Sequence, residues 1–157
     1  MKPNYILIYF FCISVNFLGQ TAVPKYYFFI KQADSLWKQK EYKNAGLAFS
    51  SAFKVFGNKG YVEDRYNAAR VWSLANIPDS AFVCLEKIIQ KKHFTDYDKL
   101  IMEKDFLNIK SNKRWQPLIN ELKANKNEPA KNQNEIFDLP DKKIINNNKT
   151  DSLYGPK

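Results

Sequence analysis

Alanine and large apolar residues recur along this chain at a constant separation of 36 residues. An internal repeat with a period of about 20 to 50 residues is typical of stacked units, because each unit buries its apolar face only against its neighbours. Small side chains at regular positions let two helices pack closely. The repeat therefore predicts an all-α fold of antiparallel helical hairpins stacked on one another. The corresponding positions are Ala33 and Ala69, Leu36 and Trp72, Ala45 and Ala81, Phe49 and Leu85, and Ala52 and Ile88.

Each repeat unit contains two segments in which apolar residues lie three or four positions apart, which is the spacing of one helix face. The first two segments are joined only by the short stretch QKEYK, so their helices must lie antiparallel and in contact. Gly57 and Asn76 accept left-handed backbone at the ends of the second and third helices, and Pro78 suits the first position of the fourth. The four expected helices lie within residues 25–40, 44–56, 61–75 and 78–92.

This spacing of small and large residues resembles the tetratricopeptide repeat (TPR) family. The family has a small residue in the middle of its first helix, small residues at two points of its second helix, and a large apolar residue between those two. The chain departs from the pattern at Ile88, which replaces a small residue, and at Lys40 and Asn76, which replace the turn glycine. Its period also exceeds the usual one of about 34 residues. The resemblance implies a short TPR-like solenoid. The matching positions are Ala33, Ala45, Phe49, Ala52, Ala69, Ala81 and Leu85.

Residues 91–123 look like the closing segment that follows degenerate repeats of this kind, so the resemblance covers residues 25–123. Thr95 and Asp98 have the spacing of a capping box that opens a short helix. Trp115 begins a last amphipathic stretch, and Pro117 would fall near the first turn of that helix. We expect this segment to cap the open, apolar end of the stack.

Residues 1–19 have the pattern of an export signal. One basic residue, Lys2, precedes an apolar run that is shorter than the roughly 20 residues of a membrane span. Gly19 is the first choice for the end of the signal and Ala22 the second; the alternative is a segment retained as an uncleaved anchor. The signal predicts a protein that is periplasmic or secreted, with no membrane contact beyond the signal itself. After cleavage, Cys84 remains as a lone thiol, which we expect to be a small, partly buried apolar residue.

Residues 124–157 are rich in Asn, Lys and Pro, and we expect them to be a disordered tail. The stretch EIFDLP within it is either a tolerated part of that tail or a short motif that folds on a partner. The formal net charge of +9 rests mainly on dispersed lysines, and the aromatic residues fall mostly on the expected core faces. We therefore expect no nucleic-acid partner.

The sequence contains no convincing catalytic, metal-binding or phosphate-binding motif. The one histidine, His93, lies near Asp96 and Asp98, and the three residues suggest either a metal site or, as we prefer, a helix start at which the carboxylates cap free N–H groups. No glycine-rich phosphate loop and no Cys-x-x-Cys pair occur. We expect no enzyme activity, no cofactor and no bound metal.

The TPR resemblance implies a concave groove, lined by the first helix of each unit, that holds a peptide segment. Tyr, Trp and Arg side chains often dominate binding energy at protein interfaces. The alternative for Trp37 and Tyr66 is that both are simply partly buried core residues. The candidate partner-binding residues are Tyr27, Asp34, Trp37, Lys38, Glu63, Tyr66, Arg70 and Ser73.

These observations predict an exported, non-catalytic, TPR-like adaptor that binds a protein or peptide partner in the bacterial cell envelope. The alternative is a structural accessory subunit that joins a larger envelope complex through its convex face or through the cap around Trp115.

Overall fold

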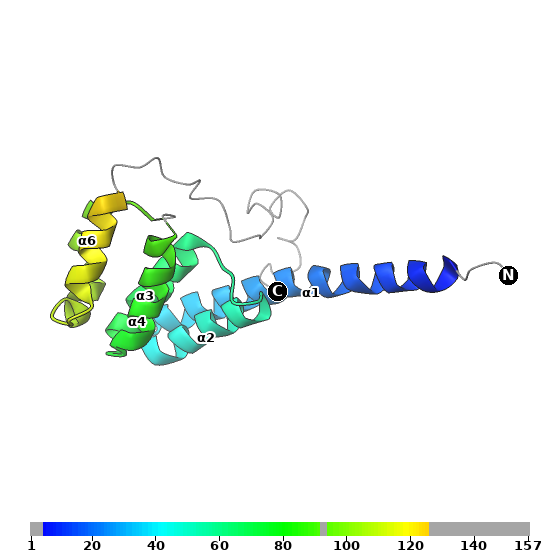
Figure 1. Cartoon of the computed structure of the whole chain (residues 1–157). Coiled ribbons are helices and arrows are strands. Elements are labelled where there is room, and N and C mark those ends of the chain that lie inside the picture. The colour runs from blue at the N-terminus through cyan, green and yellow to red at the C-terminus, as the bar shows by residue number, and fades with distance from the viewer. Residues whose placement is uncertain (1–4, 92–93, 126–157) are drawn as a thin grey trace.

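A computed structural model describes residues 5–91 and 94–125, with side chains from residue 22 onward. Helices and turns make up this part of the chain, and it contains no strand, so the predicted all-α class is confirmed. Figure 1 shows the helices packed side by side in chain order. The elements are α1 (Tyr5–Lys38), α2 (Tyr42–Val55), α3 (Val62–Leu74), α4 (Pro78–Gln90), α5 (Tyr97–Met102), the 3₁₀ helix η1 (Lys104–Ile109) and α6 (Trp115–Asn125).

The turns after α1 and α3 are built in the same way. Lys40 and Asn76 both adopt left-handed backbone, with φ values of 62° and 57°. In the first turn the Glu41 N–H donates to the Leu36 carbonyl, and in the second the Ile77 N–H donates to the Trp72 carbonyl, each at 2.9 Å. This is the bond pattern of a helix that ends on a left-handed residue. Two non-glycine residues therefore end α1 and α3 in the left-handed conformation that glycine most often adopts, as the sequence predicts for Asn76.

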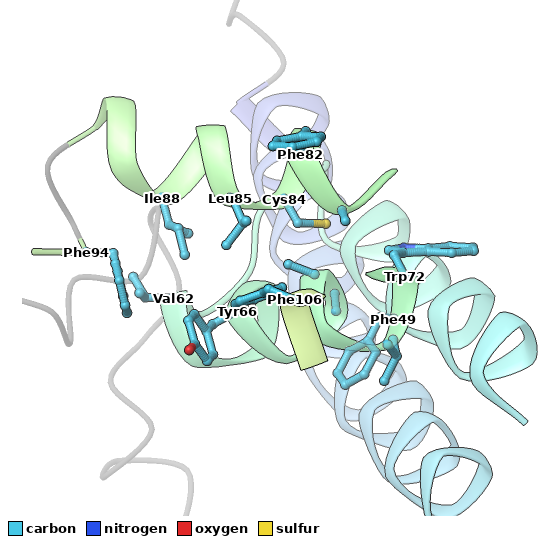
Figure 2. Close-up of a cluster of buried hydrophobic side chains, with 14 of the residues drawn as sticks. Phe49, Val62, Tyr66, Trp72, Phe82, Cys84, Leu85, Ile88, Phe94 and Phe106 are labelled. Carbon is cyan, nitrogen blue, oxygen red and sulfur yellow. The ribbon is translucent and has the colours of Figure 1, made fainter. Parts of the chain in front are cut away.

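The core follows the 36-residue register. Helix α1 packs against α2, α2 against α3, and α3 against α4. Figure 2 shows side chains of α4 pointing toward those of α3 in one apolar cluster. Of the matched pairs, only Leu36 remains half-buried. The other nine positions of that register are buried: Ala33, Ala45, Phe49, Ala52, Ala69, Trp72, Ala81, Leu85 and Ile88.

Helix α1 is longer than the predicted first helix. It runs without interruption from Tyr5 to Lys38 and includes Gly19, Ala22 and Pro24. Its N-terminal part extends past the other helices in Figure 1. In the part of the chain that the structure describes, no helix is both long and apolar enough to span a membrane. The export signal and its cleavage site stay predictions.

The closing segment packs against the helices that precede it. Its 3₁₀ helix η1 packs against α3, and α6 packs against α4. Its first helix has a different cap from the predicted one: the carboxylate of Asp96, rather than the hydroxyl of Thr95, accepts a bond of 2.9 Å from the Lys99 N–H. Pro117 lies in the first turn of α6, as predicted. The predicted disordered tail lies outside the described residues from 126 onward.

Candidate functional site

The structure brings together two of the predicted groove residues, Trp37 of α1 and Arg70 of α3. The Arg70 guanidinium carbon lies 4.5 Å from the centre of the Trp37 ring. The same guanidinium forms ion pairs with Glu103 at 3.0 Å and with Asp105 at 2.9 Å. Arg70 is therefore already bound by carboxylates of the closing segment, and it covers one face of the tryptophan.

Tyr66 and Ser73 do not lie on an open surface, so their assignment to the groove was wrong. Both are buried, Ser73 completely. The Tyr66 ring stacks on Phe94 at 5.1 Å and meets Phe106 edge-on at 5.5 Å between ring centres. Asn108 donates to the Ser73 carbonyl at 3.2 Å. The closing segment therefore covers the face of α3 on which the sequence predicted a partner to bind.

Four predicted groove residues remain accessible: Tyr27 and Asp34 are half-buried, and Lys38 and Glu63 are exposed. We call these four residues the first-helix strip. The Tyr27 hydroxyl donates to that of Tyr61 at 2.7 Å, and burial, followed by this bond, raises the pKa of Tyr27. The strip thus combines one fixed aromatic side chain with carboxylate and ammonium groups that reach solvent.

The sequence also suggested a metal site near His93 and a partner contact around Trp115, both in the closing segment. His93 lies outside the described residues, and Asp96 caps α5. Within residues 5–91 and 94–125, no group of three or more His, Cys, Asp or Glu side chains is arranged to hold a metal ion. Trp115 is buried, with its ring 6.1 Å from that of Phe106, so it offers no surface of its own to a partner.

A cavity of about 290 Å³ lies between α2 and α4, over α3, and the sequence analysis did not predict it. In Figure 2 the side chains of Trp72 and Cys84 lie on the same side of the apolar cluster. The sequence spacing could have indicated this cavity, because Arg65 and Trp72 are seven residues apart on one helix and therefore share a face. We call this site the α2–α4 cavity. Its walls include Phe53, Arg65, Trp72, Val83, Cys84 and Lys87.

The α2–α4 cavity is lined by two cations, Arg65 and Lys87, and by the carboxylate of Asp79. Arg65 is only 3% exposed; it donates to the Asn58 carbonyl, and its guanidinium carbon lies 4.3 Å from the centre of the Phe53 ring. Burial lowers the pKa of Arg65. The pKa of Lys87 is lowered by burial and then by the nearby charge of Arg65. The two positive charges therefore disfavour each other in one cavity.

The thiol of Cys84 is expected to be unreactive in the folded protein. Burial raises its pKa to about 11, so a Cys12→Ser chain should react with a disulfide reagent at pH 8 about a hundredfold more slowly folded than unfolded in urea. Because the folded pKa lies above the unfolded value, this group's contribution to stability is complete below about pH 9 and is lost toward pH 11. Equal rates for folded and unfolded chain, followed by absorbance of the released reagent, would contradict the burial of this side chain.

The arrangement offers two surfaces of different chemistry, the first-helix strip and the α2–α4 cavity. No protein-family model, curated protein or solved structure was found to match this chain.

Proposed function

We propose that this chain is an exported, non-catalytic, TPR-like adaptor that binds a protein or peptide partner in the bacterial cell envelope. The observation that carries the proposal is a set of contacts that recur at a separation of 35 or 36 residues along the chain. Arrays of stacked hairpins present long surfaces built from successive units, and such surfaces are used for binding.

The recurring contacts join each unit to the next. The hydroxyl of Tyr26 accepts from the Tyr61 N–H, 35 residues away, and Arg70 pairs with Asp105 at the same separation. Arg114 pairs with Asp79, again 35 residues away, and Asn125 donates to the Ile89 carbonyl, 36 residues away. These separations support a third, irregular unit in which α5 and η1 replace a first helix and α6 is the second.

The first-helix strip is the surface on which we place the partner. Helices α1 and α3 meet there through the Arg70 guanidinium, which lies over the Trp37 ring. The strip offers Tyr27 as a rigid aromatic contact and both signs of charge for polar contacts around it. Aromatic anchors with a polar rim are the usual composition of a binding surface.

Affinity capture from an envelope extract tests the proposal. The bait is the expected mature chain from Gln20, and the strip variant combines Lys38→Glu with Glu63→Lys, which reverses two exposed charges without touching the core. We expect the partner's recovery to fall at least tenfold. Lys54→Glu, an exposed change on α2, is the control and should leave recovery unchanged. Equal recovery with the strip variant would refute this site.

A structural accessory role is the second candidate, because the closing segment leaves two apolar side chains in solvent. Met102 is 77% exposed and Leu107 63% exposed. Both residues belong to the closing segment, and exposed apolar patches mark contact surfaces. A Met102→Ser, Leu107→Ser variant forms a further arm of the capture experiment. Loss of the partner in this arm alone would assign the function to the closing segment.

A further inference from the structure

We propose that residues 135–139 of this chain, Glu-Ile-Phe-Asp-Leu, dock in the α2–α4 cavity with the side chain of Phe137 between its apolar walls. These residues lie outside the part of the chain that the structure describes. The proposal rests on the walls of the cavity, on the place where the described chain ends, and on the residues that follow that place. It goes beyond the proposed adaptor function, because it does not depend on the first-helix strip.

The α2–α4 cavity combines buried aromatic walls with exposed residues that reach solvent. Phe53 and Trp72 are each 6% exposed, whereas Val83 is 48% exposed. Ser50 and Lys87, which also line the cavity, are exposed. An apolar side chain that enters from solvent would therefore cover Val83 and contact the aromatic rings. Removal of that apolar surface from water favours docking.

The size of the cavity limits its occupant. Its volume of about 290 Å³ lies at the lower end of the range for ligand pockets, which is about 300 to 1,000 Å³. It suits one or two side chains rather than a whole helix. A short segment that presents a single aromatic ring therefore matches the cavity better than a folded partner does.

The charge available to an occupant comes from Lys87. Arg65 belongs to the wall, because it is 3% exposed and is engaged by a backbone carbonyl and by the Phe53 ring. The carboxylate of Asp79 lies two helical turns from Lys87 on α4 and 3.2 Å from the Arg114 guanidinium. An acidic residue next to the docked side chain would therefore be attracted toward the Lys87 end of the cavity.

The tail starts close to this end of the cavity. The Asn125 side chain donates to the Ile89 carbonyl at 2.9 Å, so the end of α6 lies against the end of α4. Val83 lies six residues before Ile89 on α4, which is about 9 Å along a helix axis. The chain from Asn125 to Phe137 can span up to about 40 Å. A ligand tethered within this reach can have an effective concentration on the order of millimolar, so a small apolar contact is enough to hold it.

The sequence of the tail selects this segment as the occupant. Ile136, Phe137 and Leu139 are apolar, and Glu135 and Asp138 place a carboxylate on either side of the aromatic residue. The apolar pair farther along the tail has the opposite charge beside it, because two lysines precede it directly. Lys87 would repel those lysines. The residues of this second stretch are Lys142, Lys143, Ile144 and Ile145.

Paramagnetic relaxation in the full chain tests the proposal. A nitroxide label is attached at Asn134→Cys, next to the segment, in a Cys12→Ser chain. Labelling at pH 7 spares Cys84, because burial raises its pKa to about 11, and mass spectrometry verifies one label per chain. The enhanced relaxation of the Val83 amide proton, measured against the same sample with the label reduced, reports how close residue 134 comes to the cavity.

Two pairs of substitutions in the tail separate docking from mere proximity. The segment variant combines Phe137→Ser with Leu139→Ser, and the matched control combines Ile144→Ser with Ile145→Ser. Each removes two apolar side chains from the tail and leaves the tether length unchanged. We expect the segment variant to lower the enhancement at Val83 at least about tenfold, because the segment would then sample the whole volume allowed by its tether. The matched control should change it less than twofold.

Equal enhancement in the original chain and the segment variant, or no enhancement at Val83, would overturn the proposal. A larger enhancement at the Met102 amide than at Val83 would also overturn it, because the segment would then lie on the closing segment. So would an undiminished enhancement when chains that carry only the label are mixed with chains that carry only the isotope, because the occupant would then come from a second copy. The strip variant should leave the enhancement unchanged, so this proposal and the proposed function can fail separately.

Discussion

Replacing Phe106 with alanine is expected to lower the free energy of unfolding by about 3 to 5 kcal/mol, the usual cost of removing a buried Phe side chain. Phe106 is completely buried. Its ring meets Tyr66 of α3 edge-on and lies 6.1 Å from Trp115 of α6. The substitution therefore opens a cavity at the point where the closing segment packs on α3. Urea unfolding followed by circular dichroism at 222 nm measures the change.

The neighbouring residue is the control. Leu107 belongs to the same 3₁₀ helix but is 63% exposed. Leu107→Ala should change the free energy of unfolding by no more than about 0.5 kcal/mol, as is usual for surface substitutions. A Phe106→Ala variant as stable as Leu107→Ala would show that the closing segment does not pack on α3 as described here.

Replacing Gly46 with alanine is expected to lower the free energy of unfolding by about 2 kcal/mol, although alanine is the better helix former by about 1 kcal/mol. A Cβ at position 46 would lie 2.5 Å from atoms of the Trp72 ring. The indole is 6% exposed and packed between helices, so it cannot move aside without disturbing the core. The sign of the effect is the informative result, because helix propensity alone predicts stabilisation.

A double-mutant cycle assigns this cost to the contact with Trp72. In a Trp72→Leu background the smaller side chain leaves room for the new methyl group, so Gly46→Ala should cost much less or become stabilising. Ser50→Ala, on the same helix at an exposed position, should stay within about 0.5 kcal/mol of the original chain. Stabilisation by Gly46→Ala in the original chain would contradict the close approach of α2 and Trp72.

The closing segment covers part of the face on which the sequence predicted a partner to bind. Tyr66 is buried, and Arg70 is held by Glu103 and Asp105. The face predicted to form the groove is therefore partly occupied by the chain's own residues, and its accessible residues lie on α1 and at the start of α3.

Local pattern was sufficient to predict α2, α3 and α4, the turns between them and most of the core, but not the length of α1 or the 3₁₀ helix η1. The alanines at positions 33, 45, 69 and 81 are all completely buried, as their 36-residue register predicts. Asn76 ends its hairpin turn with left-handed backbone, and Pro78 opens α4. These features depend on backbone preference and helical periodicity, which neighbouring residues along the chain express directly.

The element that covers each helix face could not be predicted from local sequence pattern. Trp37 and Tyr66 are both aromatic residues on the predicted groove face, yet η1 and Phe94 bury Tyr66, while Trp37 keeps partial exposure under Arg70. The α2–α4 cavity likewise requires Arg65 and Lys87 to meet across two helices. Helical periodicity identifies the residues that share a face, but the element that packs on that face is chosen by contacts between distant parts of the chain. Those contacts depend on how the side chains of several helices fit together and on how their charges pair.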